Sequence, residues 1–135
     1  MRSLTSLLMA GVVLASAASA FALPPIPHYL AEAVGGKEET KGFATAVEGL
    51  KSKCDVCHKP GADKKGKGHG LNDFGLAFKK HLNDKAFMAA HKEKNTAEAT
   101  KLFTEAWGKV VDDKNAAGET FGSLIKAGKL PGKND

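Results

Sequence analysis

Cysteine and arginine are scarce in this sequence of 135 residues, and long apolar runs occur only near its start. Two cysteines are too few for the disulfide framework of a small secreted protein. The single arginine is Arg2, so the rest of the chain has no guanidinium group to recognise phosphates or base edges, and we exclude nucleic acid as a partner. No segment alternates apolar and polar residues as a strand does, and no repeat is present. The sequence therefore predicts an all-α fold.

The first 22 residues have the pattern of a secretory signal peptide. A short basic start at Arg2 precedes an uncharged apolar run over residues 7–18, and small residues follow at Ala18, Ala20 and Ala22. The run is too short to cross about 30 Å of hydrocarbon, and no second one follows. We predict a leader over residues 1–22, cleaved near Ala20 or Ala22. The mature chain is then exported without a membrane span, to the periplasm or another extracytoplasmic compartment.

The remaining residues, about 113, are enough for one small domain. The three prolines of residues 23–27 predict an extended lead-in over 23–37, with a helical turn or two from His28 to Val34 and a stop at Gly35-Gly36. The folded domain is expected over residues 38–130. Apolar spacing and capping residues predict helices over 38–53, from Asn72 or Asp73 through His81, over 85–92, from Thr96 to about 113, and over 116–127.

The most informative stretch is Cys54-Asp55-Val56-Cys57-His58, at the end of the first of these helices. Two cysteines three residues apart, followed directly by histidine, form the C-x-x-C-H signature of covalent c-type haem attachment. In such sites the two sulfurs add across the porphyrin vinyl groups, and the histidine ligates the iron. Because these are the two cysteines of the chain, no other cysteine framework competes for them.

With this motif, the leader and a closing helix that has an apolar stripe, the chain resembles a small monohaem c-type cytochrome of class I. The resemblance implies a helical domain wrapped around one covalent haem c. It implies Cys54 and Cys57 as thioether anchors and His58 as the proximal iron ligand. It also implies that the helix before the motif packs on the C-terminal helix. The apolar residues that would meet there are Phe43, Val47 and Leu50 with Phe121, Leu124 and Ile125.

The ligand on the other side of the iron is less well defined by the sequence. His81 lies on the apolar stripe that contains Phe74 and Phe78, and we place it first as the distal ligand. Met88, the one methionine outside the leader, is the alternative, although its surroundings look helical and lack the proline of many class I methionine loops. His91, His69 and an open coordination position complete the possibilities. The ligand matters because methionine opposite histidine raises the reduction potential, whereas a second histidine favours a lower one.

The implied function is that of a soluble one-electron carrier between extracytoplasmic redox partners, and not that of an enzyme. Lysines flank the motif and would attract partners that are acidic at the docking face. These lysines are Lys51, Lys53, Lys59, Lys64, Lys65 and Lys67. The alternative is a haem protein that binds a diatomic gas, or the haem subunit of a larger redox complex. A third hypothesis without haem uses the two cysteines with His58 and His69 for zinc, or the cysteines alone as a redox dithiol.

Overall fold

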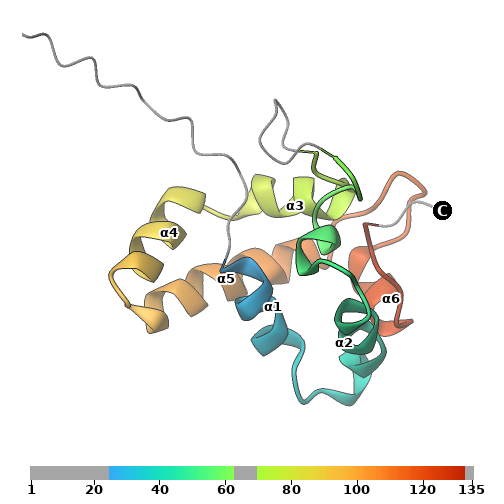
Figure 1. Ribbon diagram of the computed structural model, residues 1–135, viewed down its shortest axis with the longest axis horizontal. Helices are drawn as coiled ribbons and strands as arrows, with labels where there is room; N and C mark the ends of the chain where they lie inside the picture. Colours follow the sequence, from blue (N-terminus) through green and yellow to red (C-terminus); the bar gives the residue numbers. More distant parts are fainter. Residues whose placement is uncertain (1–24, 63–69, 133–135) are drawn as a thin grey trace, which may run out of the picture.

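The computed structural model describes residues 25–62 and 70–132, and these form an all-α fold, as predicted (Figure 1). The elements in chain order are helix α1 (Ile26–Val34), 3-10 turn η1 (Glu38–Thr40), helix α2 (Lys41–Glu48), 3-10 turn η2 (Lys53–Val56), and helices α3 (Asp73–His81), α4 (Asp84–Lys92), α5 (Thr96–Val110) and α6 (Phe121–Lys126). None of the helices in these two stretches is long and apolar enough to cross a membrane. The predicted leader, residues 1–22, lies outside the described residues.

Helix α1 confirms the helical turns predicted from His28 to Val34, but it begins two residues earlier, so the prediction of an extended backbone was wrong at Ile26 and Pro27. The helix starts directly after Pro25, and Pro27 lies in its first turn. Proline is tolerated there because the first N–H groups of a helix have no intrahelical partner. The helix ends before Gly35, as expected. Its buried side chains are Ile26, Tyr29, Leu30 and Val34, so this segment is part of the domain core.

The predicted helix over residues 38–53 is broken into shorter elements. Helix α2 ends at Glu48, and Gly49 is its C-cap. The Nζ atom of Lys53 donates hydrogen bonds of 2.9 and 2.8 Å to the carbonyl oxygens of Val47 and Glu48. These carbonyls belong to the last turn, where oxygens lack partners within the helix, and a cation also suits that end of the helix dipole. The C-x-x-C-H motif consequently has a separate turn of its own.

Helix α2 packs against α6, which is the contact that the resemblance implied between these two elements. Phe43 of α2 is fully buried in the shared core. The approach is close because glycines meet at the contact: a Cβ atom on Gly42 would lie 3.0 Å from the Cα atom of Gly128. Gly128 has a φ angle of 72°, a left-handed conformation that favours glycine after a helix end. The C-terminal helix therefore supports the segment that leads into the motif.

Asparagine side chains begin the three central helices. Asn72 caps α3 and Asn83 caps α4, each accepting a hydrogen bond from the backbone N–H three residues later. Asn95 caps α5 in the same way, so the prediction of Thr96 as the cap is wrong by one residue. Asparagine is among the strongest N-cap residues because its short side chain reaches the free N–H groups of the first turn.

Helix α6 is shorter than the predicted helix over residues 116–127. It begins after Thr120, whose hydroxyl oxygen accepts a hydrogen bond of 3.2 Å from the N–H of Ser123. The residues before it form a loop in which Lys114 and Thr120 pair as an isolated antiparallel bridge. Gly118 in this loop has a φ angle of 85°, which is incompatible with a right-handed helix.

The core contains aromatic side chains from all six helices of the described residues. Phe78 and Phe103 stack with ring centroids 5.4 Å apart, and Trp107 stacks on Phe103 at 6.4 Å. Among the described residues, six phenylalanines are fully buried: Phe43, Phe74, Phe78, Phe87, Phe103 and Phe121. Burial of each contributes about 1.5–3 kcal/mol. An exposed ion pair such as Lys41 with Glu38, at 3.9 Å, contributes about 0–1 kcal/mol, so the aromatic core dominates the stability.

Candidate functional site

The C-x-x-C-H motif forms a tight turn centred on the carbonyl oxygen of Cys54. This oxygen accepts hydrogen bonds from the N–H groups of Cys57 and His58, at 3.1 and 3.0 Å. The turn is started by Ser52, whose hydroxyl oxygen accepts a bond of 3.3 Å from the N–H of Cys54. The three residues that the sequence predicted as haem anchors and proximal ligand are therefore brought together on η2 and the two residues that follow it.

The two thiols differ in their surroundings. Cys54 is exposed and Cys57 is partly buried, and both are free cysteines. Burial raises the pKa of the Cys57 thiol to about 12, and the nearby Cys54 adds to this increase. His58 is 5 % exposed and pairs with Leu71 as an isolated antiparallel bridge. The turn thus presents one accessible sulfur, one shielded sulfur and one buried imidazole.

Asn72 connects this turn to the start of helix α3. Its side-chain Nδ2 donates a hydrogen bond of 2.9 Å to the carbonyl oxygen of Val56, and its backbone N–H donates one of 3.0 Å to that of Cys57. The same side chain accepts a bond of 2.9 Å from the N–H of Gly75, as the helix cap. Asn72 is 4 % exposed, so these bonds are shielded from water. The sequence indicated its role as a cap, but not its role as a support of the motif.

Gly75 allows helix α3 to touch the motif. A Cβ atom on Gly75 would overlap the carbonyl oxygen of Cys57 and would lie 2.8 Å from a methyl group of Leu71. No residue larger than glycine therefore fits at this point without moving the turn or the helix. Phe74, the preceding residue, is fully buried and contacts Phe78 and Trp107, so the helix that supports the motif is itself held by the aromatic core.

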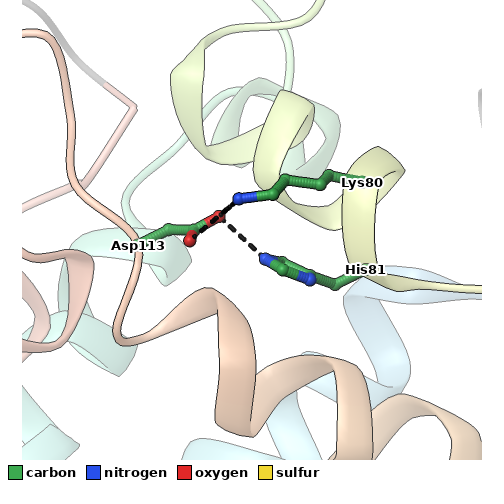
Figure 2. A network of polar contacts seen from close by, with 3 residues as sticks. All are labelled: Lys80, His81 and Asp113. Carbon is green, nitrogen blue, oxygen red and sulfur yellow. Dashed lines mark hydrogen bonds and ion pairs between the residues drawn. The ribbon is translucent and has the colours of Figure 1, made fainter.

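His81, our first choice as distal ligand, forms a polar network at the end of α3 (Figure 2). Its Nε2 atom lies 2.9 Å from Oδ2 of Asp113, and Nζ of Lys80 lies 3.2 Å from both oxygens of that carboxylate. The side chain of His81 is 17 % exposed and that of Asp113 is 26 % exposed. The network was not predicted, because Asp113 follows 32 residues later in the chain and nothing local marks it as the partner.

The other candidates for the distal ligand lie on α4 or outside the described residues. Met88 is partly buried and packs against the hydrophobic core. His91 is exposed, and its Nδ1 atom is 3.4 Å from the hydroxyl oxygen of Tyr29. His69, which the zinc hypothesis also requires, lies outside the described residues. Within residues 25–62 and 70–132, no group of three or more His, Cys, Asp or Glu side chains is placed to hold a metal ion.

The predicted lysine cluster is described in part. Lys51 and Lys59 are exposed beside the motif. Lys53 is used at the end of α2, where its ammonium group bonds two carbonyl oxygens. Lys64, Lys65 and Lys67 lie outside the described residues. Two of the three described lysines therefore remain available to attract an acidic surface.

The donor set fits covalent attachment of a haem. The turn holds two free thiols three residues apart, and a histidine follows them directly. The buried residues at the turn are uncharged: Val56 lies within it, and Leu71, Asn72 and Gly75 lie against it. Such surroundings would shield from water a group that is attached at Cys54 and Cys57.

Substitution of Gly75 tests the contact between α3 and the motif. Gly75→Ala should destabilise the protein by about 1–3 kcal/mol, because the added methyl group overlaps a backbone oxygen. Gly108→Ala in α5 is the matched control: no atom lies within 4 Å of the place its methyl group would take, and alanine favours a helix, so stability should rise by up to about 1 kcal/mol. Urea unfolding of both variants and of the unsubstituted protein measures these changes in the free energy of unfolding. Equal effects of the two substitutions would contradict the close contact.

Alkylation of the haem-free chain tests the difference between the two thiols. At pH 8, Cys54 should react with iodoacetamide well before Cys57, because Cys54 is exposed and a pKa of about 12 leaves only on the order of 10⁻⁴ of Cys57 as thiolate. Mass spectrometry of peptides after short labelling gives the order. Simultaneous labelling in the folded state would show that the turn is not closed, and urea-unfolded protein supplies the reference in which both thiols react.

Acidification tests the network of Lys80, His81 and Asp113. Partial burial raises the pKa of the Asp113 carboxyl, but the hydrogen bonds and charges of His81 and Lys80 outweigh it, so this pKa lies below its ordinary value of 3.8. The stabilisation is present above the unfolded pKa and is lost as the pH falls through the folded one. Between about pH 5 and pH 2, Asp113→Asn should therefore lose less stability than the unsubstituted protein. Asp112→Asn, at the exposed neighbouring residue, should lose as much stability over this pH range as the unsubstituted protein does. Urea unfolding of the three proteins at each pH measures the free energy of unfolding and tests this expectation.

Comparisons with known proteins do not identify a family or a function for this chain. The chain matches no family model, and no similar curated protein or solved structure was found. The functional interpretation therefore depends on the C-x-x-C-H turn and the residues around it.

Proposed function

We propose that the chain is an exported monohaem c-type cytochrome that transfers single electrons between extracytoplasmic redox partners. The observation that carries this proposal is the turn in which Cys54, Cys57 and His58 are held together against helix α3. Cys54 and Cys57 would form the two thioether bonds, and His58 would ligate the iron on the proximal side. The haem would supply one-electron redox chemistry.

The residues around the turn have defined tasks in this function. Asn72 and Gly75 hold the turn in place, through hydrogen bonds to two of its carbonyl oxygens and through a contact with no room for a side chain. A fixed support limits the rearrangement that accompanies each change of charge, which favours rapid electron exchange. The uncharged aromatic core behind α3 lowers the local dielectric constant, and this is one means by which a protein sets a reduction potential.

The exposed lysines beside the motif support a short-lived encounter with an acidic partner. Lys51 and Lys59 are both exposed, and the chain without residues 1–22 has a net charge of +4, from 19 Lys and 15 Asp and Glu. Positive charge near the site accelerates association without requiring a tight complex. In this proposal the partners are redox proteins with acidic docking faces, met after export directed by residues 1–22.

One observation favours a second candidate function, the binding of a diatomic gas. Nε2 of His81 is hydrogen-bonded to Asp113 at 2.9 Å, so the first candidate for the distal ligand has another partner. An iron that lacks a strong sixth ligand can bind carbon monoxide or nitric oxide. Such a protein would serve as a gas-binding protein or as the haem subunit of a larger complex.

A pyridine haemochrome spectrum of the denatured protein tests the proposed cofactor. The chain, expressed with its leader in a host that matures c-type cytochromes, should contain one haem that stays attached after unfolding. The double variant Cys54→Ser, Cys57→Ser should lose it, whereas Asp112→Asn, remote from the motif in sequence, should keep it. Unsubstituted protein without covalent haem would refute the proposal.

Addition of carbon monoxide to the reduced protein then separates the two functions. An unchanged Soret band supports the electron carrier, and a shifted band supports gas binding.

A further inference from the structure

The one tyrosine and the one tryptophan of the sequence contact the same buried aromatic ring. Helix α1 packs against α5 (Figure 1), and this contact brings the ring centroid of Tyr29 to 5.9 Å from that of Phe103. Trp107, one turn further along α5, stacks on Phe103 with the centroids 6.4 Å apart and the ring planes 15° apart. Two side chains that can lose a single electron to a strong oxidant are therefore joined by one stacked ring.

The two side chains differ in their access to solvent. Trp107 is partly buried and lines a surface pocket of about 410 Å³ beside α6. Tyr29 is only 3 % exposed. A small oxidant in solution can therefore reach the indole, whereas the phenol is shielded and exchanges electrons mainly through its aromatic neighbours.

The hydroxyl group of Tyr29 has a proton acceptor beside it. A phenol that loses an electron becomes strongly acidic, so its radical persists only when the phenolic proton can leave. The oxygen lies 3.4 Å from Nδ1 of His91 on α4, and this nitrogen accepts a hydrogen bond when the ring hydrogen is on Nε2. His91 is exposed, so a proton that it takes up can pass on to water.

We propose that Trp107 and Tyr29 form an internal route for one-electron oxidation, with His91 as the proton acceptor. A one-electron oxidant removes an electron from the indole of Trp107, and the indole N–H releases its proton to water. One electron then moves from Tyr29 to the Trp107 radical, which takes a proton back from water, while the phenolic proton passes to Nδ1 of His91. His91 returns this proton to water. The net products are the reduced oxidant, a neutral radical at Tyr29 and one released proton.

The direction of the route follows from the chemistry of the two radicals. At neutral pH a neutral tryptophan radical oxidises tyrosine, so the electron moves toward Trp107 and the radical comes to rest at Tyr29. An external one-electron reductant such as ascorbate then restores the phenol. The route uses neither the cysteines nor a haem, so it stands or falls separately from the proposed function.

Pulse radiolysis of the haem-free full chain tests the route. Azide radicals generated at pH 8 oxidise the accessible indole by one electron, and the separate absorption bands of the tryptophan and tyrosine radicals are followed in time. The tryptophan radical should decay in a first-order process, at the rate at which the tyrosine radical forms and independently of protein concentration. Decay without a tyrosine radical, or with a rate that rises with protein concentration, would overturn the proposal.

A matched pair of substitutions tests the proton acceptor. His91→Gln keeps a hydrogen-bond acceptor near the phenol but removes the base, so the transfer should slow on the order of 10²-fold. His28→Gln is the control, because the ring of His28 lies 5.3 Å from that of Tyr29 but its Nε2 pairs with Glu32 at 3.3 Å. Both histidines are exposed, so neither change disturbs the core. An unchanged rate in His91→Gln, or equal slowing in the two variants, would also overturn the proposal.

Tyr29→Phe removes the electron donor and keeps its ring in the core. The tryptophan radical should live longer in this variant than in the unsubstituted protein, because Tyr29 no longer reduces it. An equal lifetime would show that another group reduces Trp107, which contradicts the route.

Discussion

The contact between the Cys57 carbonyl oxygen and Gly75 is the constraint on which the rest of the site depends. Glycine is required there because a methyl group would overlap the oxygen, and the hydrogen bonds of Asn72 hold the same turn from one side. The neighbouring Phe74 is fully buried, so movement of the turn would have to displace the aromatic core. A short 3-10 turn is only weakly stable by itself, and these contacts fix it to the rest of the domain.

The core and the site use different kinds of interaction for different purposes. Buried phenylalanines supply most of the stability through removal of apolar surface from water, which is strong but imposes little direction. The polar groups are directional: Asn72 supports the motif, Lys53 completes the end of α2, and Asp113 joins α3 to the loop that follows α5. Each of these bonds determines where a segment ends or how it is oriented, and so they determine the shape of the site.

The sequence predicted the features that depend on near neighbours. The C-x-x-C-H motif, the all-α class, the cap at Asn72 and the stop at Gly35 are all readable within a few residues. The features it did not predict depend on distant partners: Asn72 bonds the carbonyl oxygen of Val56 sixteen residues earlier, and Asp113 bonds His81 across 32 residues. Ile26 and Pro27 were assigned to an extended segment because proline statistics outweighed their position in a first helical turn. No local sequence pattern shows which distant residue will form a hydrogen bond with Asn72 or with His81.

The last described residues lie on the support of the motif. Pro131 is fully buried, and Gly132 lies so close to the side chain of Asn72 that a Cβ atom there would overlap its amide group. The support that Asn72 gives to the turn therefore depends on residues near the end of the described chain, and it is complete only when those residues have packed. A protein shortened before residue 131 would keep Cys54, Cys57 and His58 but would lose the neighbour that holds the side chain of Asn72 in place.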